Sequence, residues 1–316
     1  MKKKAIVVVG ATASGKTALG VHIAKKFNGE VISADSMQIY KGMNIATAKP
    51  TAVEMDGIKH HLIDFVDVKD QYSVSNYCDD AKVVIDKVVE SGKLPVIVGG
   101  TGLYIDSFLS NTKFLESASS DSIKQGLLLE AEKNGIESLY EQLKEIDPDA
   151  AENIHPNNTV RVVRALEIYK TTGKTLTEQN KLSHTVESDI EPLYIGINYA
   201  DRENLYNRIN LRVDLMLEAG LLEEANEFFN MNPSQTAFNA IGYKELKPFI
   251  DGDLSFDVCV DNLKRETRRY AKRQITWFKR NKNINWVFPD KLSKEELFGT
   301  VDNLINDFLG GDMIEE

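Results

Sequence analysis

Cysteine is scarce in this 316-residue sequence: only Cys78 and Cys259 occur, far apart and without a CxxC pair. A disulfide framework or a zinc site needs more cysteines at closer spacing, so neither is expected. Long apolar runs are also missing, and the lysines at 2–4 lead straight into a short strand pattern without the apolar region of a signal peptide. These absences predict a cytoplasmic protein with reduced thiols and no membrane partner.

Basic residues are in the minority, with 38 Lys and Arg against 48 Asp and Glu and a net charge of −10. Such an acidic average argues against indiscriminate binding to nucleic acid. One segment is the exception, because nine basic residues and a single acid, Glu266, lie between Lys264 and Lys282. Cations gathered on one helix of an acidic protein favour a polyanionic partner, nucleic acid or phosphate, over a merely solvated face.

The strongest positive feature is the glycine-rich stretch GATASGKT at 10–17. It follows an apolar β-branched run and precedes a helical pattern, which is the context that a phosphate-binding loop requires. Its glycines let backbone N–H groups converge on an anion, its lysine supplies a cation, and Thr17 can offer a hydroxyl to Mg²⁺. The pattern leaves open whether that anion belongs to a nucleotide or to another diphosphate. The expected binding residues are Gly10, Ala11, Thr12, Ala13, Ser14, Gly15, Lys16 and Thr17.

Two further strand patterns end in polar or glycine-rich segments. The predicted strand Glu30–Asp35 delivers Asp35 at its carboxyl end, and the polar stretch 36–50 that follows is a candidate substrate loop. The predicted strand Pro95–Val98 runs into the Gly-rich turn GGTGLY at 99–104. Because loops after the carboxyl ends of strands form the ligand crevice of an open α/β sheet, Asp35 is expected near the phosphate loop.

The order of these patterns predicts an α/β fold: a P-loop NTPase-like parallel sheet core with a helical insertion domain. From about residue 111 strand patterns disappear and helical patterns rich in Glu and Lys follow, through Gln125–Glu145 and beyond. A strand-like run, Leu193–Tyr199, then restores the α/β character. The expected domains are a catalytic core at 1–112 and 191–316, with C-terminal helices that bind nucleic acid, and an insertion at 113–190.

The residues alone admit more than one function. A nucleotide or metabolite kinase would use the loop for ATP and Asp35 for the acceptor or Mg²⁺, but it leaves the basic helix unexplained. A nucleotide switch would place a Walker-B carboxylate where Pro95–Val98 ends in glycines, although Asp35 could take that role. The phosphate loop, Asp35, the second glycine-rich turn and the basic helix must be explained together.

Seven sequence blocks carry a resemblance to a known family. They are GATASGKT (10–17), DSMQIYKGMNIATAKP (35–50), HHLID (60–64), GGTGLY (99–104), RVVRALE (161–167), AIGYKE (240–245) and RYAKRQITWFKR (269–280). In content and order they resemble the bacterial tRNA dimethylallyltransferases, also called tRNA isopentenyltransferases. The chain has Ala11, Asn44 and Ala46 where the family usually has Pro, Asp and Gly. None of these departures removes a proposed chemical group, although Ala46 restricts the backbone more than glycine would.

The resemblance implies transfer of a dimethylallyl group from dimethylallyl diphosphate to N6 of an adenosine in tRNA. That adenosine lies 3′ to the anticodon, at tRNA position 37, in tRNAs that read codons beginning with U. In this scheme Lys16, the loop amides and Mg²⁺ held by Thr17 stabilise the leaving diphosphate. Arg208 would clamp the diphosphate, and Asp35 would accept a hydrogen bond or a proton from the N6 amino group. Thr101 would line the channel where the two substrates meet.

A monomer is expected, and the resemblance implies that its partner is the tRNA anticodon stem-loop, with the insertion closing on the stem. The target base would leave its stack to enter the site. The implied tRNA-contacting residues are Asp35, Ser36, Met37, Gln38, Thr101, Val160, Arg161, Val162, Val163, Arg164, Asn239, Ala240, Ile241, Gly242, Tyr243 and Lys244, together with Arg268, Arg269, Lys272 and Arg273 of the basic helix.

Overall fold

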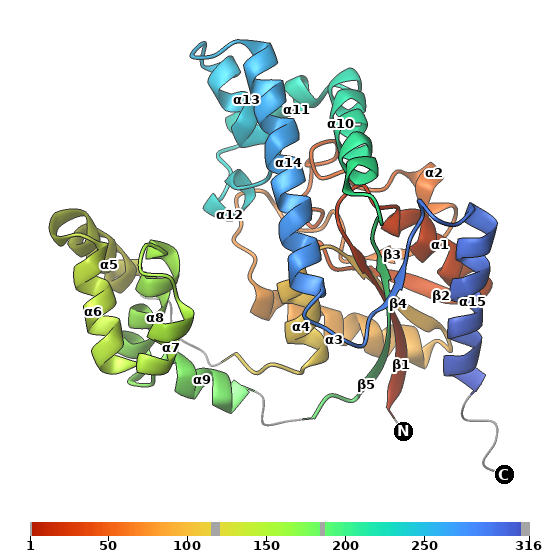
Figure 1. Cartoon of the computed structure of the whole chain (residues 1–316), viewed down its shortest axis with the longest axis horizontal. Helices are drawn as coiled ribbons and strands as arrows, with labels where there is room; N and C mark the ends of the chain where they lie inside the picture. Colours follow the sequence, from red (N-terminus) through yellow and green to blue (C-terminus); the bar gives the residue numbers. More distant parts are fainter. Residues whose placement is uncertain (1, 115–120, 184–186, 311–316) are drawn as a thin grey trace. The chain divides into compact units, whose positions relative to one another are not determined.

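The computed structural model of the chain describes residues 2–114, 121–183 and 187–310. The chain divides into two compact units, Met1–Leu109 with Asp189–Glu316 and Ser110–Ser188. We call the first the core unit and the second the helical unit (Figure 1). The core unit contains one parallel sheet with helices on both faces, so the predicted α/β fold class is confirmed.

The sheet of the core unit has six strands in the order β3-β2-β4-β1-β5-β6, and every neighbouring pair is parallel. The strands are β1 (Lys3–Gly10), β2 (Gly29–Ser33), β3 (His60–His61), β4 (Leu94–Gly99), β5 (Ile190–Ile197) and β6 (Asn285–Val287). The strand predicted at Glu30–Asp35 ends at Ser33, so Asp35 belongs to the following loop. The edge strands β3 and β6 were not predicted, because two or three residues show no periodicity.

The central strand β1 is buried on both faces, which explains its continuous apolar run. Ile6 and Val8 pack in one cluster with residues of α1 (Lys16–Lys26) and α15 (Lys294–Gly310). Val7 and Val9 pack in the opposite cluster with residues of α3 (Val74–Glu90) and α4 (Gly102–Leu109). Successive side chains of a strand point to opposite faces, so each face receives alternate residues of the same run. This two-sided core holds the carboxyl edge of the sheet in place.

The described part of the core unit contains ten helices: α1 (Lys16–Lys26), α2 (Ala52–Met55), α3 (Val74–Glu90), α4 (Gly102–Leu109), α10 (Arg202–Glu218), α11 (Leu221–Asn230), α12 (Gln235–Phe238), α13 (Tyr243–Ile250), α14 (Phe256–Phe278) and α15 (Lys294–Gly310). The long helix α14 packs against α10, α13 and α4 and contacts β1 (Figure 1). It therefore reaches from the C-terminal helices to the centre of the sheet.

The helical unit contains α5 (Asp121–Asn134), α6 (Ile136–Ile146), α7 (Pro148–Asn153), α8 (Thr159–Thr172) and α9 (Leu176–Ser183). Its core joins Leu139 and Leu143 of α6 to Val162 and Leu166 of α8. The helical pattern predicted through Gln125–Glu145 is two helices, because the chain turns at 135, a glycine with φ +83°. Across residues 2–114, 121–183 and 187–310, no helix is both long and apolar enough to cross a bilayer.

Candidate functional site

The glycine loop joins β1 to α1 at the carboxyl edge of the sheet. Gly10 has φ +154° and Gly15 has φ +102°, and Gly15 is the N-cap of α1. A Cβ atom at Gly10 would lie 2.6 Å from the carbonyl oxygen of Ile197, so a side chain there would collide with β5. The loop therefore presents backbone N–H groups and a helix N-terminus, an arrangement that binds phosphate groups.

Three cationic side chains approach this loop. Lys16 Nζ and Arg208 Nε donate hydrogen bonds to loop carbonyl oxygens at 2.6 and 3.0 Å. Loss of hydration lowers the pKa of Lys16 to about 8, while the charge of Asp35 opposes this shift and that of Arg212 adds to it. Within the described residues, Lys16, Arg208 and Arg212 form no ion pair with a carboxylate. The glycine loop therefore has an excess of positive charge beside it.

Arg212 lies one helical turn after Arg208 on α10 and is half-buried. Loss of hydration lowers its pKa, against the opposing charges of Glu54 and Asp35. Its guanidinium makes no hydrogen bond to any described residue. A half-buried cation without a partner is unfavourable unless a ligand supplies acceptor oxygens. The resemblance assigns only Arg208 to the diphosphate, and the four-residue spacing of the two arginines was the available signal for Arg212.

The Ser14 side chain fits the same interpretation of the loop. It is 3% exposed, and its Oγ has no hydrogen-bond partner among the residues that the structure describes. A buried hydroxyl left unpaired costs stability, so such groups are rare and generally await a ligand or water. An anionic ligand rich in oxygen, such as a diphosphate with its magnesium ion, fits this loop.

Asp35 and Thr101 come together beyond the ends of neighbouring strands. Oδ1 of Asp35 accepts hydrogen bonds from the N–H groups of Met37 and Gln38 at 2.9 and 3.3 Å. Oγ1 of Thr101 accepts a hydrogen bond from the N–H of Ser36 at 3.1 Å. Because β2 and β4 are adjacent and parallel, their carboxyl ends hold both side chains at one edge of the sheet. The Asp35 carboxylate and the Thr101 hydroxyl therefore lie at the start of the candidate substrate loop.

Gln274 of α14 links the two glycine-rich segments. Its Oε1 accepts a hydrogen bond from the N–H of Thr12 at 2.8 Å, and its Nε2 donates to the carbonyl oxygen of Gly100 at 3.0 Å. The side chain is 5% exposed. One partner is a donor and the other an acceptor, so the orientation of the amide is determined. Sequence analysis did not identify Gln274, because its partners lie 262 and 174 residues away.

Tyr270 lies one turn before Gln274 on α14 and is also close to Thr101. Loss of hydration, with the charge of Asp35 as a further cause, raises the pKa of its phenol. The phenol therefore stays protonated beside the Asp35 carboxylate. Its signal in the sequence was the four-residue spacing to Gln274 on the apolar side of the basic helix.

The basic residues of α14 differ in how far they are neutralised. Arg268 donates a hydrogen bond to the neutral Oδ1 of Asn210 on α10, whereas Arg269 forms an ion pair with Glu266 at 2.6 Å. Lys272 and Arg273 are exposed and form no ion pair in the part of the chain that the structure describes. These two residues therefore carry the most accessible charge of the four that were predicted to bind tRNA.

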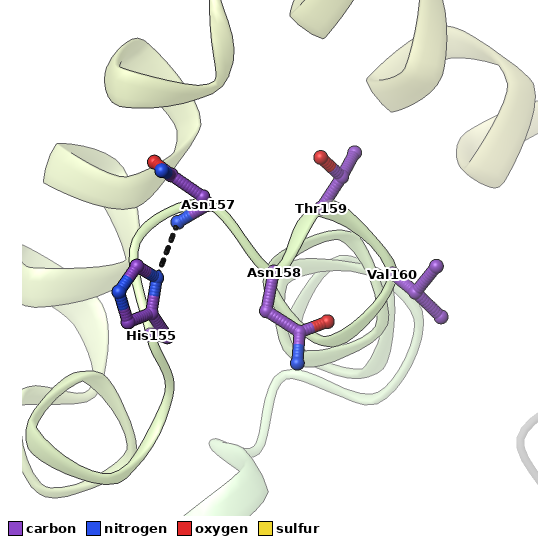
Figure 2. Close-up of a pocket in the computed structure, with 5 residues that line it drawn as sticks. All are labelled: His155, Asn157, Asn158, Thr159 and Val160. Carbon is purple, nitrogen blue, oxygen red and sulfur yellow. Dashed lines mark hydrogen bonds between the residues drawn. The ribbon is translucent and has the colours of Figure 1, made fainter. Parts of the chain in front are cut away.

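The helical unit has an open pocket at the start of α8, lined by His155, Asn157, Asn158, Thr159 and Val160 (Figure 2). The N–H of Asn157 donates to Nδ1 of His155 at 3.2 Å, as drawn in Figure 2. Asn158 caps the helix, with Oδ1 accepting from the N–H of Arg161 at 3.3 Å. The first turn of α8 is thereby fixed with polar groups around it.

The predicted tRNA segment 160–164 is only partly available at the surface. Val160 is 78% exposed, and Arg161 and Arg164 are exposed. Val162 and Val163 are buried in the core of the helical unit, because they lie on the face of α8 that packs against α5 and α6. Exposed side chains of this segment therefore come from its other three residues.

The predicted segment 239–244 shows the same division. Asn239 and Lys244 are exposed, whereas Ala240 and Tyr243 are 2% and 0% exposed and belong to the main core cluster. Lys244 Nζ donates to the carbonyl oxygen of Asn239 at 3.3 Å, which closes the segment on itself. A buried tyrosine at the start of α13 indicates a role inside the protein.

The fold and the loop together define a P-loop-like protein that brings a glycine loop, nearby cationic side chains and a carboxylate to one sheet edge. The IPP transferase family model matches residues 38–281. A tRNA dimethylallyltransferase of Caldanaerobacter subterraneus subsp. tengcongensis is 47% identical over 288 residues, 90% of this chain and 91% of that protein.

Two solved structures are similar along nearly the whole chain. The tRNA isopentenylpyrophosphate transferase of Bacillus halodurans has a TM-score of 0.74 and 40% identity, covering 98% of both chains. A eukaryotic dimethylallyltransferase acting on tRNA has a TM-score of 0.81 and 32% identity, covering 98% of this chain and 80% of that one. The chain therefore belongs to the IPP transferase family.

Proposed function

We propose that this protein transfers a dimethylallyl group from dimethylallyl diphosphate to N6 of the adenosine 3′ to the anticodon in tRNAs reading U-starting codons. One observation carries the proposal. Lys16 and Arg212 have no carboxylate partner among the described residues, and both lie close enough to Asp35 for its charge to affect their pKa values. The tRNA dimethylallyltransferases at 44–47% identity support the same substrates. A kinase function would not explain the exposed cations Lys272 and Arg273 of α14.

On the donor side, the bond between the allylic carbon and the diphosphate oxygen breaks and negative charge grows on the leaving diphosphate. Lys16, Arg208 and Arg212 and the loop N–H groups stabilise that charge. Ser14 Oγ, buried and unpaired, donates to a diphosphate oxygen. When bound beside Thr17, Mg²⁺ supplies further charge neutralisation to the diphosphate.

On the acceptor side, the adenine N6 amine forms the new bond to the allylic carbon and loses a proton to the Asp35 carboxylate. Oδ1 of Asp35 is held by two loop N–H groups, which aims the side chain before the base arrives. An exocyclic amine is a weak nucleophile, so alignment contributes at least as much as proton removal. Gln274 sets this alignment, because it joins the donor loop to the turn that carries Thr101.

The tRNA is bound by both units in this proposal. The core unit performs the chemistry and places Lys272 and Arg273 against RNA phosphates. Its segment 35–38 and the exposed Asn239 and Lys244 of segment 239–244 contact the nucleotides around the extruded base. The helical unit contacts the anticodon stem through the exposed residues of segment 160–164. All proposed catalytic groups belong to one core unit, so we expect a monomer to be active.

The function is tested by incubating the protein with radiolabelled dimethylallyl diphosphate, Mg²⁺ and unmodified tRNA, followed by nucleoside digestion. Label recovered as N6-dimethylallyl adenosine is the expected result. ATP consumption with phosphoryl transfer to a small acceptor, and no label in tRNA, would instead establish a kinase.

Donor binding should depend on pH through Lys16. Its pKa is lowered to about 8, so the ammonium group is cationic below that pH and neutral above it. Affinity for inorganic diphosphate with Mg²⁺ should therefore be highest below about pH 8 and fall toward about pH 9.5. Lys16→Arg stays charged over this range and should flatten the fall. Calorimetric titration at several pH values measures this, and a level wild-type profile would contradict the prediction.

Replacing Lys272 and Arg273 by glutamine should weaken tRNA binding and reduce its salt dependence. Each phosphate contact that is lost lowers the slope of log affinity against log salt by about 0.7 to 0.9. Filter binding with unmodified tRNA at several salt concentrations measures the slope. The matched control is Lys25→Gln with Asp56→Asn, which removes an exposed ion pair outside the proposed tRNA-binding residues. An unchanged slope in the Lys272/Arg273 variant would rule out phosphate contacts by these two residues.

A further inference from the structure

The carboxylate of Glu224 on α11 binds three successive N–H groups of the candidate substrate loop. Oε2 accepts from Asn44 and Ile45 at 2.9 and 2.8 Å, and Oε1 accepts from Ala46 at 3.0 Å. The Tyr243 hydroxyl donates a fourth hydrogen bond to Oε1 at 2.8 Å. Successive N–H groups around one point form an anion-binding nest, and here a side chain of the protein fills it.

The nest is connected to Asp35 through a short series of hydrogen bonds. Directly after the nest, the carbonyl oxygens of Thr47 and Ala48 each accept from Gln38 Nε2 at 3.2 Å. The N–H of Gln38 in turn donates to Oδ1 of Asp35 at 3.3 Å. Glu224 therefore fixes the far end of a loop whose near end holds the proposed proton acceptor.

Tyr243 connects the same carboxylate to the segment 239–244. The tyrosine is fully buried and stacks on Phe228, with ring centroids 4.1 Å apart. Loss of hydration and the charge of Glu224 raise the pKa of the phenol, so it remains a donor. The preceding Gly242 has φ +118°, and a Cβ atom there would lie 2.9 Å from Cβ of Ala46. The start of α13 and the substrate loop are thus in direct contact.

We propose that Glu224 is a positioning residue for the acceptor adenosine. Its charge orders the loop 44–48 and, through Gln38, the direction of the Asp35 carboxylate. Through its hydrogen bond with Tyr243, Glu224 also links segment 239–244 to this loop. When tRNA binds that segment, the Asp35 carboxylate is therefore already directed at the N6 amine. The inference rests on the proposed function, because it concerns the alignment of the acceptor base in that reaction.

The test compares Glu224→Gln and Tyr243→Phe with the wild-type protein in dimethylallyl transfer to unmodified tRNA. The amide keeps the size of the side chain but replaces an acceptor oxygen by an N–H₂ group facing a loop N–H. Glu224→Gln should lower kcat/KM for tRNA by about tenfold to a hundredfold, since misplacement of about 1 Å has an effect of this size. The Kd for inorganic diphosphate with Mg²⁺, which reports the cradle, should stay within about twofold of the wild-type value.

Tyr243→Phe removes only the hydroxyl and preserves the core volume, so it keeps the test valid if the glutamine variant folds poorly. It should lower kcat/KM for tRNA in the same direction, and the double variant should be little worse than Glu224→Gln alone, because both remove one linkage. Glu227→Gln, an exposed carboxylate nearly one turn further along α11, is the matched control and should behave as wild type.

If the wild-type protein transfers the dimethylallyl group normally, two results would overturn the role of Glu224 without affecting the proposed function. One is a Glu224→Gln variant with unchanged kcat/KM for tRNA. The other is a variant that loses diphosphate affinity and transfer in equal proportion, since a general loss of structure moves both. Absence of transfer by the wild-type protein would instead overturn the proposed function, and this inference with it.

Discussion

Replacing Asp35 by asparagine is expected to lower the rate of dimethylallyl transfer by about 10²- to 10⁴-fold, the usual contribution of a positioned acid or base. Asparagine keeps the Oδ1 acceptor for the N–H groups of Met37 and Gln38, so the loop should retain its shape. The variant loses the negative charge that receives the N6 proton. Single-turnover assays at saturating substrate isolate this step, and tRNA affinity should remain close to that of the wild type.

A matched control is available in Asp67, whose Oδ1 accepts a hydrogen bond from the N–H of Lys69 at 3.0 Å in an exposed turn. Asp67→Asn makes the same chemical change in a similar backbone turn away from the glycine loop. It should leave transfer unchanged. A transfer rate within about threefold of wild type for Asp35→Asn would remove Asp35 from the proposed chemistry.

Replacing Lys16 by alanine is expected to reduce transfer by about 100- to 1,000-fold, the cost of removing one stabiliser of developing negative charge. The loss should appear mainly as weaker binding of diphosphate and slower release of it from the allylic carbon, with tRNA affinity preserved. Because Lys16 is a half-buried cation without a carboxylate partner among the described residues, its removal should leave the melting temperature unchanged or raised.

The control for this variant is Lys25→Ala on the same helix. Lys25 is exposed and pairs with Asp56, so its loss removes a charge from α1 without touching the loop. Binding of inorganic diphosphate with Mg²⁺, measured by calorimetry, should distinguish the two variants. Equal affinities in Lys16→Ala and Lys25→Ala would show that the glycine loop binds no diphosphate through Lys16.

Features encoded by neighbouring residues were predictable from the sequence. The apolar run before Gly10 and the helical pattern after Lys16 predicted a strand, loop and helix that the structure contains. The predicted strand Pro95–Val98 lies within β4, and the predicted strand Leu193–Tyr199 overlaps β5. These predictions rest on short-range steric and hydrogen-bonding preferences that do not need the rest of the fold.

The glycine-rich turn at 99–102 shows where local reasoning stops. The sequence showed a glycine-rich turn after a predicted strand, but the structure gives a reason for these glycines that the local pattern does not contain. A Cβ atom at Gly100 would lie 2.1 Å from Nε2 of Gln274, and one at Gly102 would lie 2.2 Å from Cδ1 of Trp277. These residues are small because α14, far away in sequence, approaches them closely.

The groups that organise the candidate site were unpredictable for the same reason. Glu224 meets the loop residue Ile45 across 179 positions, and Gln274 meets Thr12 across 262. Neither contact leaves a periodic signal, because each is a single polar side chain on a helix with an ordinary apolar face. A resemblance to known proteins can indicate that such positions matter, but only the folded chain shows what they touch.

The single amide of Gln274 has a chemical consequence for the lifetime of the enzyme. Glutamine side chains age by hydrolysis to glutamate, and at this position the new carboxylate would still accept from Thr12 but would repel the carbonyl oxygen of Gly100. Such damage would separate the two loops while leaving the rest of the fold intact. The side chain is 5% exposed, so the packing that joins the two glycine-rich loops also shields this amide from the water that would age it.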